Sequence, residues 1–173
     1  MPKGTCYGWS DVPVAETFEQ EAAETKKNIE GLDFDMVYSS PLTRARKLAE
    51  FCGWSNPVVD DRLKEMNMGN WEMKLFDEIE DENLQRWYDD YMHQPTTNGE
   101  SFPMLYARVA AFLDELKQKP YKRVAVFAHG GVLMCAGIYG NLFSEKDCFK
   151  HLAPYGGCLL YTSPSPRDRT RSR

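Results

Sequence analysis

Two residues that could bind an anion follow two predicted strands. His129 comes at the end of the apolar run 124–128 and directly before two glycines, and Arg44 comes six residues after the apolar run 34–38. Both places predict a turn from a strand into a helix, where free backbone N–H groups favour an anion. A guanidinium can donate two parallel hydrogen bonds to two phosphate oxygens. A histidine can donate a further hydrogen bond to an oxygen whose negative charge increases in the transition state. Together the two residues indicate a phosphate site.

Phosphoryl transfer also needs an acid that protonates the leaving oxygen. Glu65 lies in the long irregular stretch 60–72, and Glu100 lies just before a predicted helix, so either carboxyl group is a candidate. Taken one at a time, these residues have simpler explanations: a solvated arginine, a strand-end histidine and carboxylates that face water. Their common position at the strand ends of one sheet favours the functional interpretation.

Other catalytic chemistries lack their sequence patterns. The chain contains no G-x-S-x-G nucleophile elbow, no P-loop, and no cysteine followed six residues later by arginine. The three histidines, His93, His129 and His151, are not spaced as metal ligands, so we expect neither a metal nor another cofactor.

Composition predicts one α/β domain over residues 1–161. Of the 173 residues 42% are hydrophobic and the net charge is −5, so we expect neither a nucleic-acid partner nor, without a long apolar run, a membrane span. The five cysteines are scattered and form no C-x-x-C pair, which favours a reducing cytoplasm. Residues 162–173 contain no apolar residue, and we expect a disordered, non-native tail.

The elements that must position these residues alternate between strand and helix. Strand 124–128 is so continuously apolar that we expect helices to cover both of its faces. Ser40 is predicted to cap a helix that begins at Pro41, and Ser101 to cap another. The pattern predicts strands at 34–38, 58–59, 124–128 and 158–161, and helices at 18–30, 41–52, 76–91 and 102–119, besides one after the glycine pair.

Four blocks resemble, in order, the signature segments of the histidine phosphatase (phosphoglycerate mutase-like) superfamily. They are Ser-Ser-Pro-Leu-Thr-Arg-Ala at 39–45, Leu-Lys-Glu at 63–65 with Gly-Asn-Trp-Glu at 69–72, Gly-Glu-Ser at 99–101, and Ala-His-Gly-Gly at 128–131. Within that superfamily, residues 3–13 most resemble the α-ribazole phosphatases of cobalamin biosynthesis.

The resemblance implies a three-layer α/β/α sandwich with a mostly parallel sheet, and hydrolysis through a phosphohistidine. It implies that Arg44 binds the phosphate group, that His129 stabilises the transferring phosphoryl group, and that Glu65 protonates the leaving oxygen. Three further residues would border the pocket, namely Glu100, Ser101 and Gly130. The partner would be a small phosphate ester, most closely α-ribazole 5′-phosphate, whose flat heterocycle could stack on Tyr7 or Trp9 unless these residues serve only loop packing.

One element of the family pattern is not found. The superfamily's nucleophilic histidine follows an arginine at the end of the first strand, and no such segment precedes Lys3. We therefore expect a fragment with its first strand missing, unpaired edges in the sheet, and little or no activity for this chain. The alternatives are a broad-specificity phosphatase or mutase of the same fold, and a phosphate-binding pseudophosphatase. The oligomeric state is not predicted.

Overall fold

The computed structural model describes residues 1–162, so the predicted tail lies outside it except for Thr162. Within that range no helix is both long enough and apolar enough to cross a membrane. The α-helices and strands are α1 (Phe18–Asn28), β1 (Met36–Ser39), α2 (Thr43–Phe51), β2 (Val58–Val59), α3 (Glu82–Asp89), α4 (Phe102–Lys117), β3 (Val124–Phe127) and α5 (Gly130–Tyr139). Four 3₁₀ segments complete the described part: η1 (Asp61–Leu63), η2 (Gly69–Trp71), η3 (Phe76–Glu78) and η4 (Glu145–His151).

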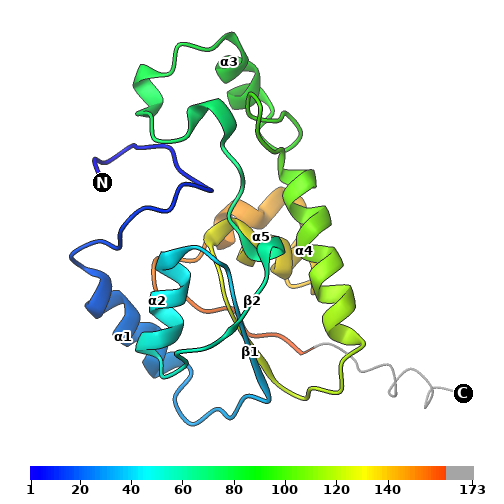
Figure 1. Ribbon diagram of the computed structural model, residues 1–173. Coiled ribbons are helices and arrows are strands. Elements are labelled where there is room, and N and C mark those ends of the chain that lie inside the picture. The colour runs from blue at the N-terminus through cyan, green and yellow to red at the C-terminus, as the bar shows by residue number, and fades with distance from the viewer. Residues whose placement is uncertain (163–173) are drawn as a thin grey trace, which may run out of the picture.

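The sheet has three parallel strands in the order β2-β1-β3. Tyr38 of β1 pairs with both Val58 and Val126, and Ser39 pairs with Phe127, so β1 and β3 end side by side. Helices α1 and α2 lie on one side of the sheet, and α4 and α5 lie on the other (Figure 1). The three-layer α/β architecture expected from the sequence is confirmed.

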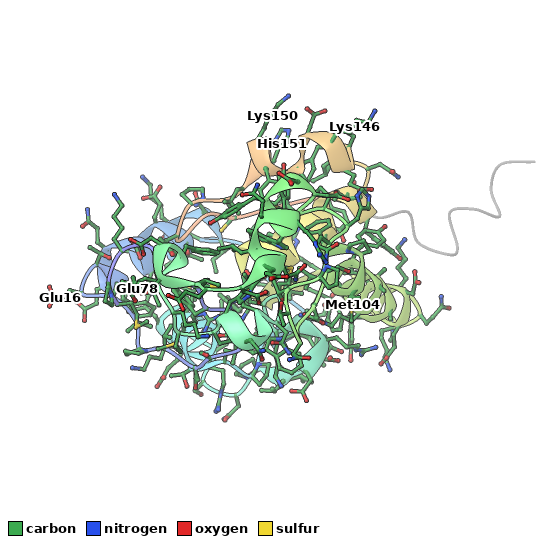
Figure 2. All side chains as sticks on the ribbon, turned by 90° about the horizontal axis from the view of Figure 1, so that it is seen from above. Glu16, Glu78, Met104, Lys146, Lys150 and His151 are labelled. Carbon is green, nitrogen blue, oxygen red and sulfur yellow. The ribbon has the colours of Figure 1, made fainter. Side chains whose placement is uncertain are left out.

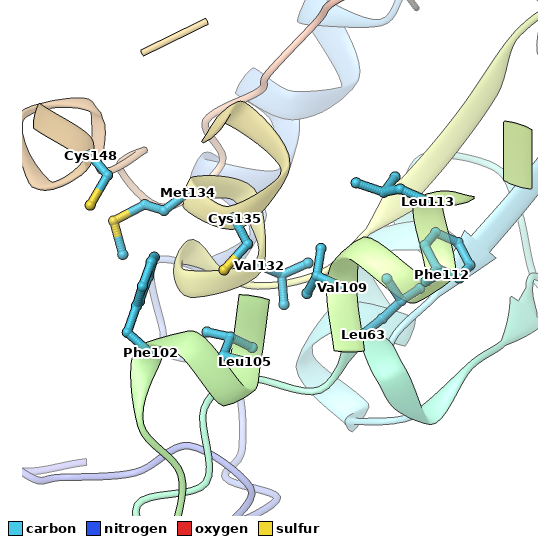
Figure 3. Close-up of a cluster of buried hydrophobic side chains, with 10 residues drawn as sticks. All are labelled: Leu63, Phe102, Leu105, Val109, Phe112, Leu113, Val132, Met134, Cys135 and Cys148. Carbon is cyan, nitrogen blue, oxygen red and sulfur yellow. The ribbon is translucent and has the colours of Figure 1, made fainter. Parts of the chain in front are cut away.

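Helix α4 supplies the largest part of the core. Leu105, Val109 and Phe112 follow helical spacing and are almost fully buried, and a proline in the first turn suits the helix start. Leu105 and Val109 lie beside Val132 and Cys135 of α5, and Phe112 lies beside Leu63 (Figure 3). A second cluster lies between the sheet and α2 and contains Val37, Ala49, Cys52, Ala125 and Phe127.

Strand β3 is not covered on both faces, in contrast to the expectation. Ala125 and Phe127 face the buried α2 side, but Val126, on the opposite face, is 36% exposed. The α4 side chain that meets the sheet there is Phe112, which contacts Tyr38 of β1, with ring centroids 5.2 Å apart. Within residues 1–162 no strand pairs with the other edge of β3.

Three predicted elements differ in the structure. The predicted helix 76–91 is divided into η3 and α3, because Asp81 caps a new helix by accepting a hydrogen bond from Asn83 N–H. Residues 158–161 form no strand, and Leu160 is 75% exposed without a neighbouring strand to pair with. Helix α2 begins at Thr43 rather than Pro41, because Ser40 accepts from Leu42 N–H in a tight turn before the helix.

The α4–α5 core makes a direct stability prediction. Leu105→Ala should lower the free energy of unfolding by about 2–5 kcal/mol, because it leaves a cavity at a side chain that is 1% exposed. Urea unfolding followed by circular dichroism measures the change. The neighbouring Met104→Ala is the control, since Met104 is 51% exposed and should change stability by less than about 0.5 kcal/mol. Equal effects of the two substitutions would contradict the assignment of the core.

Candidate active site

The site lies at the carboxyl ends of β1 and β3. The chain leaves β1 at Ser40, whose N–H donates to the carbonyl of Phe127, the last residue of β3, over 2.8 Å. This bond continues the ladder by one step and brings His129 to the same place. His129 Nε2 lies 2.8 Å from Ser40 Oγ, and both side chains are buried. Parallel sheets place ligand sites at this edge, as the sequence predicted.

Burial keeps the His129 imidazole neutral. Desolvation, with a smaller effect of the positive charges of Arg44 and Arg108, lowers its pKa from 6.5 to about 3, against a weaker opposing effect of Asp11. At neutral pH the ring is therefore uncharged, with one nitrogen that donates and one that accepts. A bound phosphate dianion would oppose this shift and favour the charged form.

Arg44 lies in the first turn of α2 and is held by the N-terminal loop. It donates from Nη1 to the Ser10 carbonyl over 2.9 Å and from Nη2 to the Gly8 carbonyl over 2.7 Å. The guanidinium carbon lies 5.4 Å from the centroid of the Tyr7 ring. These two hydrogen bonds use two of the five N–H groups of Arg44, so an anion can bind to others.

The N-terminus of α2 is less open than expected. Asp11 accepts hydrogen bonds from both Thr43 N–H, over 2.8 Å, and Thr43 Oγ1, over 2.5 Å. The hydroxyl bond is the main cause of the lowered pKa of Asp11. One of the backbone amides predicted to join Arg44 in anion binding therefore already has a carboxylate partner.

Glu72 fixes the loop that holds Arg44. Its carboxylate accepts hydrogen bonds from the backbone amides of Gly8, Trp9, Ser10 and Met68, over 2.8–3.1 Å. Burial opposes ionisation of Glu72, but these hydrogen bonds outweigh it and lower the pKa. Gly8 must be a glycine here, because a Cβ would overlap the Met66 carbonyl oxygen.

Glu65 lies at the start of α5, where its carboxylate contacts Gly131, two residues after His129. Its Oε2 accepts from Gly131 N–H over 3.0 Å, and its Oε1 accepts from Met66 N–H over 2.9 Å. A Cβ on Gly131 would overlap Oε1 of Glu65, so the second glycine of the pair permits the close approach. The structure thus brings Arg44, Glu65 and His129 to one edge of the sheet.

The other predicted pocket residues have structural contacts. Glu100 is 9% exposed and forms an ion pair with Arg108, 2.8 Å from Oε1 to Nε, so its carboxylate is already engaged. Ser101 is the residue before α4, as predicted, but its side chain makes no capping hydrogen bond. Gly130 is the first residue of α5, and Leu152 Cδ1 lies 3.0 Å from where its Cβ would be. Their ligand contacts stay predictions.

The remaining two histidines lie elsewhere. His93 Nδ1 is 2.8 Å from Asp90 Oδ1, and the His93 side chain is 65% exposed. His151 stacks on Phe143 at the outer side of η4, where Figure 2 shows it beside Lys146 and Lys150. In the part of the chain that the structure describes, no three His, Cys, Asp or Glu side chains are grouped to hold a metal ion.

Sequence reasoning missed several residues that build the site. Asp11, Ser40 and Glu72 were not assigned contacts with the site, and Arg108 was not singled out at all. The hydrogen bonds that join them to distant segments of the site span 32 to 89 residues of the chain, so no local spacing identifies them. Ser40 and Glu72 carried a signal, because they lie in two of the four motif blocks, and Asp11 lies in the stretch 3–13.

Comparison with known proteins agrees with this geometry. A sequence model of the histidine phosphatase superfamily (branch 1) matches residues 2–143, which include Arg44, Glu65 and His129. The chain belongs to this superfamily. The resemblance drawn from the four motif blocks is thereby confirmed.

Individual histidine phosphatases show the extent of the similarity. The chain is 32% identical over 143 residues to an adenosylcobalamin/α-ribazole phosphatase of Escherichia coli strain K12, covering 75% of this chain and 68% of that protein. It is 28% identical over 141 residues to phosphoserine phosphatase 1 of Hydrogenobacter thermophilus, covering 78% and 67%. The crystal structure of the α-ribazole phosphatase from Shigella flexneri superposes with a TM-score of 0.78 at 25% identity, covering 88% and 79%. Matches to curated relatives span about half to two thirds of their length.

The neutral state of His129 predicts a pH-dependent stability. His129 stays unprotonated in the folded chain down to about pH 3 but takes up a proton near pH 6.5 when unfolded, so its contribution is present above 6.5 and lost as pH falls. Between pH 7 and 5, the unfolding free energy of the parent should drop by about 2 kcal/mol more than that of His129→Gln. Urea unfolding at both pH values measures this difference. Equal drops in the two proteins would show that His129 is not buried as described.

Proposed function

We propose that this protein is a phosphomonoesterase that acts on a small organic phosphate, with α-ribazole 5′-phosphate as the substrate. The observation that carries the proposal is the convergence of Arg44, Glu65 and a buried, neutral His129 at the carboxyl ends of β1 and β3. Membership in the histidine phosphatase superfamily and similarity to α-ribazole phosphatases support it.

Each of the three residues has a role that its chemistry allows. Arg44 binds two phosphate oxygens through its guanidinium. His129 donates a hydrogen bond to the phosphoryl oxygens, whose charge changes as the group moves to a nucleophilic histidine and then to water. Glu65 in its protonated form gives a proton to the departing alkoxide, and the resulting carboxylate later removes a proton from the attacking water, which restores the carboxylic acid for the next cycle.

The chain has three histidines, and His129 is the one that lies at this site. His93 and His151 are held by Asp90 and Phe143, away from Ser40 and the strand ends. For the 173-residue chain we therefore expect phosphate-ester binding without rapid turnover. A gene product that carries a further histidine beside His129 should form the phosphohistidine and hydrolyse the ester.

Aromatic side chains beside Arg44 favour a substrate with a flat ring. Tyr7 packs on Arg44, and Tyr155 from the C-terminal segment places its hydroxyl 3.4 Å from that of Tyr7. Trp9 is 40% exposed, with Lys64 Nζ 4.8 Å from its ring centroid. Since Tyr7 and Trp9 flank the Gly8 carbonyl that holds Arg44, a ring attached to a bound phosphate would reach them.

Ligand binding tests the phosphate site. Arg44→Lys should weaken binding of inorganic phosphate and of α-ribazole 5′-phosphate by about 10- to 100-fold, because lysine lacks the guanidinium fork. Isothermal titration calorimetry on the 173-residue chain measures both affinities. Arg46→Lys, an exposed position of the same helix, is the control and should leave binding within about two-fold.

The outcomes separate the proposed function from its alternatives. Absence of phosphate binding by the parent chain, or equal binding by Arg44→Lys, would contradict the proposal. Binding without hydrolysis in a gene product that does carry the further histidine would favour a pseudophosphatase. Hydrolysis of sugar, serine and glycerate phosphates at the same rate as α-ribazole 5′-phosphate would favour a broad-specificity phosphatase, and transfer of the phosphoryl group to a sugar acid would favour a mutase.

The aromatic side chains beside Arg44 lead to a separate prediction. Tyr155→Ala should weaken binding of phenyl phosphate by about 3- to 10-fold and leave inorganic phosphate unchanged, since only the ester has a ring to stack. Calorimetric titration with both ligands measures the difference. Tyr88→Ala, which removes an exposed tyrosine of α3, should change neither affinity. A loss of equal size for both ligands would show that Tyr155 does not recognise the ring.

A further inference from the structure

Arg108 of α4 has an unusual number of partners for one side chain. Its Nε and Nη2 donate to the two oxygens of Glu100, over 2.8 and 2.9 Å. Its Nη1 donates to the carbonyls of Arg62 and Lys64, over 2.8 and 2.6 Å, and its Nη2 also donates to the carbonyl of Glu65, over 2.7 Å. All five N–H groups of the guanidinium are therefore used, in a side chain that is 17% exposed.

These contacts hold the backbone on both sides of Glu65. The three carbonyls belong to Arg62, which lies in η1, and to Lys64 and Glu65, which follow η1 outside any strand or α-helix. On the other side, the Glu100 carboxylate accepts from Asn67 N–H over 2.8 Å. A buried carbonyl without a partner is costly, so the segment depends on Arg108 for its path across the α4 surface.

The path of this segment determines where the Glu65 carboxylate lies. Glu65 reaches Gly131 N–H at the start of α5, and α5 is fixed against α4 through Leu105 and Val132. Arg108 therefore joins the backbone of Glu65 to α4. Gly131, at the start of α5, donates a hydrogen bond to the Glu65 carboxylate. A shift of the segment by a fraction of an ångström would move the carboxylate off the Gly131 amide.

We propose that Arg108 is a positioning residue that holds Glu65 in register with Gly131 and His129, through its ion pair with Glu100. The value of this position for catalysis rests on the proposed function; the position itself does not. Lysine cannot replace Arg108, because a single ammonium group cannot serve three carbonyls and two carboxylate oxygens that are spread around a planar fork.

The amide of Gly131 gives a direct readout of the Glu65 carboxylate. Its nitrogen and proton chemical shifts report the hydrogen bond to Glu65, so Glu65→Ala, which removes the acceptor, should displace both signals at neutral pH. We expect Arg108→Lys to displace the Gly131 signals by half or more of the Glu65→Ala change while the far-ultraviolet circular dichroism spectrum is kept. Two-dimensional nitrogen–proton spectra of the 173-residue chain measure it.

Arg62→Lys is the matched control. Arg62 belongs to the same segment, but its guanidinium pairs with Asp60 and Glu115 near the surface, so the Gly131 signals should stay at their parent positions. If Arg108→Lys unfolds, Glu100→Gln weakens the same ion pair and should displace the Gly131 signals as well. Unchanged Gly131 signals in Arg108→Lys, or in Glu100→Gln where the first variant is unfolded, would overturn the inference, as would Gly131 signals that do not move in Glu65→Ala.

The same samples distinguish failure of the inference from failure of the proposed function. Displaced Gly131 signals in Arg108→Lys, together with a parent chain that binds no phosphate, would support the positioning role and contradict the phosphatase. Normal phosphate binding by the parent with unchanged Gly131 signals in Arg108→Lys would do the reverse. In an active gene product, Arg108→Lys should lower kcat by about 10-fold or more with KM changed by less than about 3-fold, since Glu65 acts on the leaving group rather than on binding.

Discussion

The parallel pairing of β1 with β3 is the interaction on which the site depends. Because Ser39 pairs with Phe127, the two strands end together, and the next hydrogen bond, from Ser40 N–H to the Phe127 carbonyl, brings Ser40 against His129. A slip of one residue would turn every side chain of one strand to the other face. The alternating burial of Val37 and Phe127 against α2 opposes such a slip, so the hydrophobic core also determines the geometry of the site.

Irregular segments supply the rest of the site, and charged groups hold them in place. Glu72 accepts hydrogen bonds from backbone amides of the N-terminal loop, and Asp11 joins that loop to α2. Arg108 donates hydrogen bonds to the backbone carbonyls of the segment around Glu65. Charges removed from water are tolerated only when hydrogen-bonded, and the partly buried Glu72 and Arg108 each have several partners. The result is a candidate site in which Arg44 and Glu65 are both held in place by the surrounding chain.

Part of this organisation could be predicted from the sequence. Continuous apolar runs identified β1 and β3, helical spacing identified α4, and the motif blocks identified Arg44, Glu65 and His129 as members of one site. The prediction was wrong at 76–91, where Asp81 starts a separate helix, and at 158–161, which form no strand. The expectation that helices cover both faces of β3 was also wrong. Whether Val126 is covered depends on how α4 lies over the sheet rather than on the strand's own residues.

The sequence by itself determined the class of fold, the order of the elements and the chemical types gathered at the strand ends, because hydrophobic periodicity and turn residues act over a few positions. Tertiary structure decided which groups meet: His129 with Ser40, Glu65 with Gly131, and Glu100 with Arg108. Such hydrogen bonds join segments that are distant along the chain. Their partners are selected by the packing of helices against the sheet, and that packing leaves no local pattern in the sequence.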